Sequence, residues 1–294
     1  MSIAELKSTD RSGFPEPLFE LPTHLDLPCN EWEAENYSRE FRPLPTHLDL
    51  PETDGLPVEN TYQHPQSVLL TTTLTPLLDR LNESDEYLIG TSTAIYWMAA
   101  KRPFEGCKAP DWYYVPNVPK LLNGEFRKSY VLWEEYSNPV LVVEYVSGNG
   151  AEEHDRTPGW GKMWVYEQRI RAAFYAIWDV AKNRLEVFEL NGARTRYSAV
   201  QPNASGRFPI PQMELELGIW EGSYLGSVAR WLRGWDAKGQ LLPTPEERAE
   251  AETKRARSEK QRAESEKQRA DSEKQRADAL AAKLRELGID PDRI

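Results

Sequence analysis

The chain has 294 residues, 39% of them hydrophobic and including 10 Trp and 13 Tyr, which is enough for one globular domain with a sizeable core and some appendages. No apolar run approaches the roughly 18 residues of a membrane span, so the sequence excludes a membrane-spanning function. The cysteines are Cys29 and Cys107, and no secretion leader follows Met1, so we expect a reduced, unprocessed, cytoplasmic protein.

The formal net charge of −11 is concentrated near the N-terminus. Residues 1–60 hold 13 acids and 4 bases, whereas residues 244–294 hold 13 of each, so the region between them is nearly neutral. An acidic protein can still bind a polyanion through a local basic cleft or a bound metal. Charge therefore neither supports nor excludes a nucleic-acid substrate.

Residues 1–57 form an acidic, proline-rich N-terminal arm that contains a duplicated string. The sequence LPTHLDLP occurs at residues 21–28 and again at residues 44–51, 23 positions later. Prolines interrupt both copies. Each copy carries one His and one Asp, but we interpret the repeat as a local duplication rather than a metal site. We expect the arm to be loosely ordered or draped over the core.

Residues 58–243 carry the strong apolar patterns and are predicted to form one core domain. A helix is expected over residues 58–81, with Pro65 in its first turn and Pro76 kinking or splitting it. A second helix is expected from about Trp160 to Arg171. Apolar or alternating runs predict strands at residues 87–97, 109–115, 129–134, 139–147, 173–180 and 184–190, with further strands after Gly192 and around Trp231.

These elements predict an α+β fold, α/β/α-like, with a mixed β-sheet core and flanking helices. The third region, residues 244–294, is a charged heptad array with Ala at positions 256, 263, 270 and 277. One Ala per heptad is a thin seam for a coiled coil, so we expect one long solvated helix over residues 246–287. Weak self-association of two chains through the Ala face stays open as an alternative.

The candidate site begins with Glu144, which lies within the apolar run Pro139 to Ser147. A run of this kind is typical of a strand covered on both faces, where an unpaired carboxylate would cost several kcal/mol. Glu144 therefore needs a cation, a metal or hydrogen bonds. Asp111 opens a second short aromatic strand, and Lys162 opens the helix that follows.

Two acids on adjacent strands form a hard oxygen site suited to Mg²⁺ or Mn²⁺, which retain most of their waters. A nearby Lys can stabilise charge that develops on a phosphodiester. His154, Asp155 and Arg156 lie in the loop before the helix, where they could touch phosphate. We favour an exposed polar loop for them.

The order Pro110-Asp111, Glu144 at the end of an apolar strand, Gly161-Lys162 with Tyr166, and the strand from Tyr175 resembles the PD-(D/E)xK nuclease superfamily. The resemblance is to its Uma-type branch of restriction-endonuclease-like proteins, and it covers roughly residues 59–243. It implies a restriction-endonuclease-like core with Asp111 and Glu144 as the acid pair.

The resemblance also implies roles for other residues. The Lys usually found two positions after the second acid is replaced by Val146, and the family commonly carries it on the next helix, where Lys162 stands. Glu59 corresponds to an acid on the first helix. We add the backbone carbonyl of Tyr145 as a third expected metal ligand, beside Asp111 and Glu144.

The leading hypothesis is a Mg²⁺-dependent endonuclease that hydrolyses DNA phosphodiester bonds, with Mn²⁺ as the other cation. One alternative is a catalytically silent module of the same fold that binds nucleic acid or protein. Another is an interaction protein organised by its helical tail. The sequence does not decide between DNA and RNA.

Overall fold

The computed structural model describes residues 46–47, 50, 61–82, 86–100, 105–192 and 196–286. The chain divides between Leu242 and Pro243 into two compact units, which we describe separately. Nearly all of the N-terminal arm, including the first LPTHLDLP copy, lies outside the described residues. The three-part organisation of the chain therefore stays a prediction.

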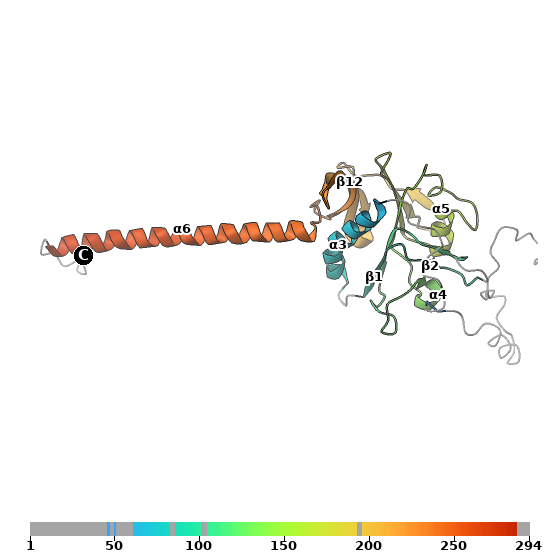
Figure 1. Ribbon diagram of the computed structural model, residues 1–294, viewed down its shortest axis with the longest axis horizontal. Helices are drawn as coiled ribbons and strands as arrows, with labels where there is room; N and C mark the ends of the chain where they lie inside the picture. The colour runs from blue at the N-terminus through green and yellow to red at the C-terminus, as the bar shows by residue number, and fades with distance from the viewer. Residues whose placement is uncertain are drawn as a thin grey trace, which may run out of the picture. The chain divides into compact units, whose positions relative to one another are not determined.

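A six-stranded mixed sheet forms the centre of the first unit (Figure 1). Among the strands that the structure describes in this sheet, only β6 and β7 pair in parallel. The chain between these two strands carries the short helix α5 (Lys162–Val165) and the π-helical turn η1 (Tyr166–Ile170). The sheet order is β1 (Tyr87–Gly90), β4 (Trp112–Pro116), β6 (Leu141–Tyr145), β7 (Phe174–Asp179), β8 (Arg184–Leu190) and β9 (Tyr197–Ala199).

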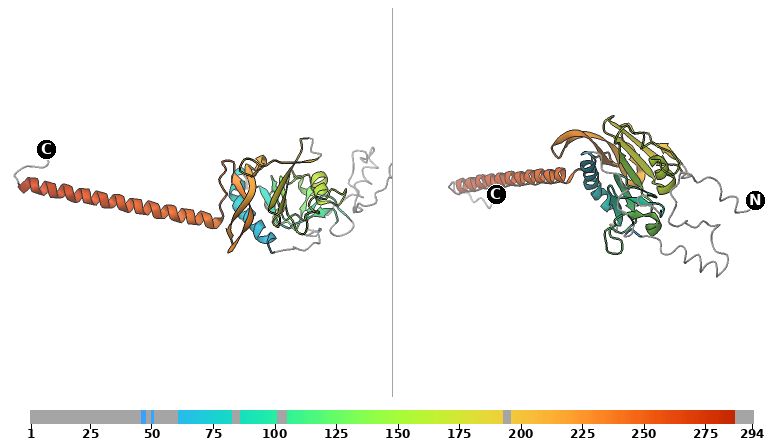
Figure 2. Two further views of the ribbon diagram at one scale, coloured as in Figure 1. Left: turned by 90° about the horizontal axis from the view of Figure 1, so that it is seen from above. Right: turned by 45° about the vertical axis from the view of Figure 1, so that its right-hand side comes forward.

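One face of this sheet is covered by helix α3 (Gln63–Leu81) and by a second sheet. That second sheet has the order β10 (Phe208–Ile210), β11 (Leu215–Tyr224) and β12 (Ser227–Asp236), and the 3₁₀ turn η2 (Pro211–Met213) precedes β11. Figure 2 shows α3 in blue beside the β11–β12 hairpin in orange. The buried amide of Gln66 fixes this contact, since it donates to the Leu232 carbonyl at 2.9 Å and accepts from the Leu232 N–H at 2.8 Å.

The other face is covered by α5 and η1, whose buried side chains Met163, Val165, Tyr166 and Ile170 pack on Val142, Tyr175 and Ile177. Helices on both faces of a mixed sheet confirm the predicted α+β, α/β/α-like architecture. Strand β6 lies between β4 and β7, and all five of its residues are buried. A strand covered on both faces reads as a continuous apolar run, which explains why residues 139–147 gave the clearest strand signal.

A small third sheet has the order β3 (Cys107–Lys108), β2 (Ile95–Tyr96) and β5 (Tyr130–Val131). It corrects two predictions. The single strand expected over residues 87–97 is broken after Gly90, where Ser92 adopts a φ of 49°, so β1 and β2 join different sheets. The strand expected over residues 129–134 ends at Val131, and helix α4 (Leu132–Glu135) follows directly.

Helix α3 continues through Pro76, so the predicted split is wrong. A proline inside a helix lacks an N–H and crowds the carbonyl four residues earlier. The leucines of α3 pack into the core on the remaining turns, and this packing outweighs the local cost.

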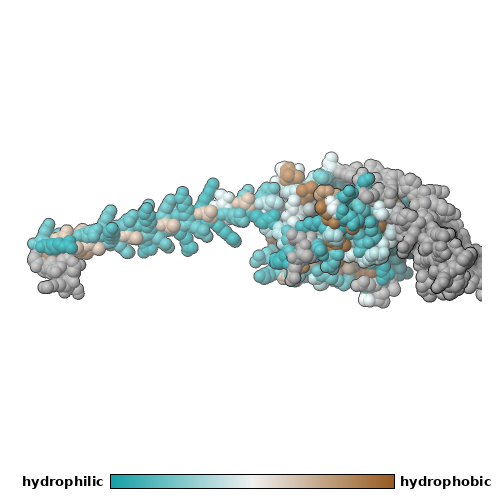
Figure 3. All heavy atoms as spheres, turned by 90° about the horizontal axis from the view of Figure 1, so that it is seen from below, coloured by the Kyte–Doolittle hydropathy of each residue, from teal (hydrophilic) through white to brown (hydrophobic). Residues whose placement is uncertain are grey.

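The second unit contains α6 (Pro245–Glu286), a helix of 42 residues, which confirms the predicted long charged helix. Thr244 and Glu247 cap its start, because the Glu247 N–H donates to Thr244 Oγ1 at 3.1 Å and the Thr244 N–H donates to Glu247 Oε2 at 2.7 Å. No residue of α6 is buried, and Figure 3 shows it as largely hydrophilic with a thin line of weakly apolar residues. No helix among the described residues is long and apolar enough to cross a bilayer.

A peptide of residues 244–287 should lose helicity as salt rises from about 0.05 to about 1 M. Oppositely charged residues four positions apart, such as Lys260 and Glu264, attract each other by only ~0.2–0.5 kcal/mol per pair, and salt screens this attraction. Circular dichroism at several peptide concentrations measures this. If helicity does not change with salt but rises with peptide concentration, the Ala face is instead a coiled-coil seam.

Candidate functional site

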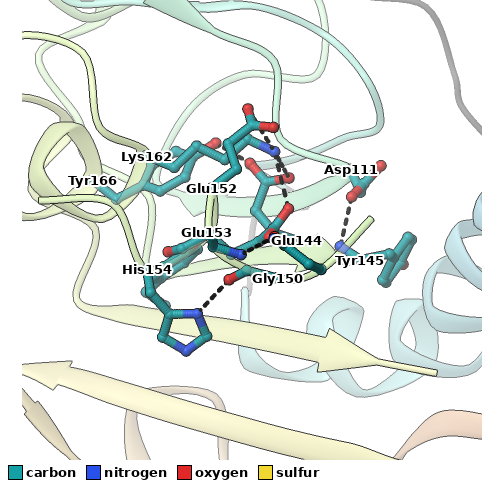
Figure 4. Close-up of polar contacts among 12 residues, drawn as sticks. Asp111, Glu144, Tyr145, Gly150, Glu152, Glu153, His154, Lys162 and Tyr166 are labelled. Carbon is teal, nitrogen blue, oxygen red and sulfur yellow. Dashed lines mark hydrogen bonds and ion pairs between the residues drawn. The ribbon is translucent and has the colours of Figure 1, made fainter. Parts of the chain in front are cut away.

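The antiparallel pairing of β4 with β6 brings two acids together. Trp112 lies opposite Val143 in the register, so Asp111, one residue before β4, lies beside Glu144 near the end of β6. Lys162 reaches the same place from the start of α5, on the chain that returns from β6 to β7 (Figure 4). The structure thus brings Asp111, Glu144 and Lys162 together, as the sequence predicted.

Asp111 is held by a backbone N–H and by a serine hydroxyl. Its Oδ2 accepts the Tyr145 N–H at 2.6 Å, and its carbonyl accepts the Ser67 hydroxyl at 3.1 Å. Burial, followed by the negative charge of Glu144, raises the pKa of Asp111 to about 8. The Tyr145 hydrogen bond and the Lys162 charge oppose this rise only in part. Asp111 is therefore a fixed carboxyl that holds its proton near neutral pH in the metal-free protein.

Glu144 has the partners that its burial demands. Its side chain is 3% exposed, Tyr166 donates a short hydrogen bond to Oε1, and Lys162 Nζ lies 3.3 Å from Oε2. Burial raises the pKa of Glu144, while Lys162 and Tyr166 act in the opposite direction. The Lys162 ammonium and the Tyr166 hydroxyl are thus the partners that the sequence predicted a buried Glu144 carboxylate to need.

Lys162 lies among three carboxylates. Its Nζ is 3.3 Å from Glu144, 3.4 Å from Glu153 and 3.5 Å from Glu152. Burial alone would lower the pKa of Lys162, but these carboxylates outweigh it and hold the pKa above its ordinary value. The side chain is a permanent cation and cannot serve as a general base at neutral pH.

The sequence reasoning missed Glu152, Glu153 and the role of Tyr166. Tyr166 lies four residues after Lys162 and so on the same helix face, a spacing that could have identified it. Glu153 has a side chain only 2% exposed, and its carbonyl accepts the Tyr175 hydroxyl at 3.1 Å. Its place depends on how the loop after β6 folds back, which carries no periodic signal.

The other predicted residues have separate outcomes. Glu59 lies outside the described residues. Tyr145 contacts Asp111 through its N–H, and the proposed role of its carbonyl as a ligand stays a prediction. The loop residues His154 and Arg156 have protein partners instead: His154 contacts the Gly150 carbonyl at 2.7 Å and Glu186 at 3.0 Å, and Arg156 pairs with Glu167 at 2.6 Å.

The donor set fits a hydrated hard cation. Four carboxyls face one ammonium, which leaves the site with an excess of negative charge when they are ionised. Among the described residues, no three or more His, Cys, Asp or Glu side chains are placed to enclose a metal. Mg²⁺ needs only one or two carboxylates because it keeps several waters, so the Asp111 and Glu144 pair suits it.

The stability of the metal-free protein should fall as pH rises. Because the pKa of Asp111 is about 8 in the fold and about 4 in an unfolded chain, only the folded state holds this proton between those values. Melting in EDTA should therefore occur at a higher temperature near pH 5.5 than near pH 8.5. Asp111→Asn should reduce the difference, and an unchanged difference would show that another group causes it.

A comparison with protein families agrees with this geometry. The model of the Uma2 family, described as "Putative restriction endonuclease", matches residues 53–229, a span that contains Asp111, Glu144 and Lys162. No curated protein matches the sequence. The family model covers more than half of the chain, and the mixed-sheet core is consistent with a restriction-endonuclease-like protein. The chain belongs to the Uma2 family.

Proposed function

We propose that this protein is a Mg²⁺-dependent endonuclease that hydrolyses phosphodiester bonds in DNA, with Mn²⁺ able to replace Mg²⁺. The observation that carries the proposal is the Lys162 ammonium, 3.3 Å from a buried Glu144 that has Asp111 beside it, one residue before the neighbouring strand β4. Membership of a restriction-endonuclease family supports a nuclease and a DNA substrate.

Asp111 and Glu144 would hold the cation. Bound there, it would polarise a phosphodiester and lower the pKa of a coordinated water. Cation binding requires Asp111 to lose the proton that burial lets it keep to about pH 8. We therefore expect metal affinity to rise with pH up to that value.

Lys162 would stabilise the negative charge that develops on the phosphate. The ammonium is already charged and already in place, so it needs no reorganisation when the charge forms. Glu152 and Glu153 give it two further partners, which would keep it in the site when Glu144 binds a cation. The Tyr166 hydroxyl orients the Glu144 carboxylate through Oε1.

Two measurements on the full-length protein test the proposal. Isothermal titration with Mg²⁺ or Mn²⁺ should give binding at millimolar concentration or below, and supercoiled plasmid should be nicked or linearised with metal but not with EDTA. Absence of both would overturn the proposal. DNA binding without metal-dependent cleavage would leave the silent binding module in its place.

A further inference from the structure

The second copy of the duplicated string contacts the core. Its described residues are Thr46, His47 and Leu50, and His47 is only 2% exposed. The backbone N–H of His47 donates to Glu134 Oε2 at 3.1 Å, and its Nδ1 accepts the Lys128 N–H at 3.4 Å. A histidine in a proline-rich arm is thus buried and bonded on two sides, which a passively draped segment would not require.

Leu50 completes the contact. It packs against a small apolar cluster of the third sheet, whose members are Ala94, Tyr96, Cys107, Val131, Ala109 and Trp133. In Figure 1, β2 and α4, which carry parts of this surface, lie close together. The surface therefore offers a carboxylate acceptor, a backbone N–H donor and an apolar cluster. The fourth residue of the string bonds to the first two, and the seventh packs on the cluster.

The first copy has the same eight residues. Its fourth and seventh positions are His24 and Leu27, so it can present the same donor, acceptor and leucine. We propose that the surface formed by Lys128, Glu134 and the apolar cluster is a binding site for the LPTHLDLP string, and that residues 21–28 of the same chain are its second ligand. The two copies then exchange on one site.

The two copies have the same eight residues but differ in the length of chain that connects them to α3. His47 is 16 residues from Gln63, where α3 begins, and His24 is 39 residues from it. Loop closure becomes less favourable with length as the three-halves power, so the second copy should be preferred about fourfold. The first copy would then occupy the site in roughly a fifth of the molecules, and in nearly all once the second copy is disabled.

The experiment uses three full-length variants. One carries His24→Ala with Leu27→Ala, one carries His47→Ala with Leu50→Ala, and one carries all four substitutions. The probe is a fluorescein-labelled LPTHLDLP peptide, followed by fluorescence anisotropy. A tethered copy acts at an effective concentration in the millimolar range, so wild type and both two-substitution variants should bind the peptide poorly. The four-substitution variant should bind it at the lowest concentration.

Matched controls define specificity. A peptide with Ala at its fourth and seventh positions should bind the four-substitution variant at least about tenfold more weakly. In the wild-type chain the Glu134 carboxylate accepts the His47 N–H. Adding Glu134→Ala to the four-substitution variant removes this acceptor, so it should weaken the binding of the unaltered peptide. Thermal unfolding of each variant verifies that the core is folded.

Three outcomes would overturn the proposal. The four-substitution variant, folded, could fail to bind the peptide or bind the altered peptide equally well, in which case the surface is not a receptor for the string. The His47→Ala, Leu50→Ala variant could bind the peptide as tightly as the four-substitution variant, in which case the first copy does not compete. The His47→Ala, Leu50→Ala variant could also bind the peptide poorly when concentrated but well when diluted. The competing copy would then belong to another molecule and not to the same chain.

Discussion

Replacement of Glu144 by Gln is expected to abolish metal-dependent DNA cleavage while leaving the fold intact. Tyr166 and Lys162 donate to different oxygens of the carboxylate, and the amide has only one. Its oxygen can accept from the Lys162 ammonium while its NH2 group donates to the Tyr166 hydroxyl oxygen, so the buried side chain keeps both partners. It lacks the charge that would hold the cation, whose contribution of several kcal/mol corresponds to a loss of at least roughly a hundredfold in rate. Mg²⁺ should raise the melting temperature of wild type and not of the variant.

Glu186→Gln is the matched control for this experiment. Glu186 is another carboxylate on the central sheet, less buried than Glu144, and it pairs with His154 and Arg184 outside the site. The Glu186→Gln protein should cleave DNA as wild type does, and Mg²⁺ should raise its melting temperature. Cleavage by the Glu144→Gln protein at the wild-type rate would contradict the proposed site.

The sequence predicted the centre of the fold best. Strands β6, β7 and β8 lie within the runs predicted at residues 139–147, 173–180 and 184–190, because both faces of β6 and β7 are covered and the hairpin turn at Asn183 is short. Leucine spacing likewise predicted α3. Such runs are informative because burial acts on every residue of the segment.

Prediction failed where single residues decide the path of the chain. A left-handed Ser92 divides one predicted strand between two sheets. After β5, the chain turns into α4, where the Arg127 guanidinium pairs with Glu135 at 2.6 Å, and both side chains are 3% exposed. This contact joins segments that the sequence pattern treats separately, so local periodicity could not reveal it.

The candidate site was predictable to a similar extent. Glu144 could be identified because it is a carboxylate within an apolar strand. Asp111 and Lys162 were identified from the neighbouring elements and from the family resemblance. Glu153 gave no signal, because its burial depends on a loop that begins with left-handed Gly148 and Gly150 and folds back over the sheet. The contact between Glu153 and the Lys162 ammonium is visible only in the tertiary structure.

Lys162→Met is expected to keep metal binding and lose turnover. Methionine retains most of the apolar stem and removes the ammonium, which would otherwise compete with a cation for Glu144. Mg²⁺ affinity measured by titration should therefore be unchanged or higher. The variant would lack the preorganised charge that stabilises the developing phosphate charge, which should lower the single-turnover rate by about 10²–10³.

Lys182→Met is the control for the loss of a lysine. Lys182 is about half exposed and pairs with Asp179 at 3.0 Å, away from Glu144, so its replacement should leave cleavage unchanged. The two readouts for Lys162 separate its possible roles, since an electrostatic role changes the rate and a structural role changes metal affinity. A Lys162→Met protein that cuts at the wild-type rate excludes the electrostatic role, and one that no longer binds Mg²⁺ shows that Lys162 instead maintains the geometry of the acid pair.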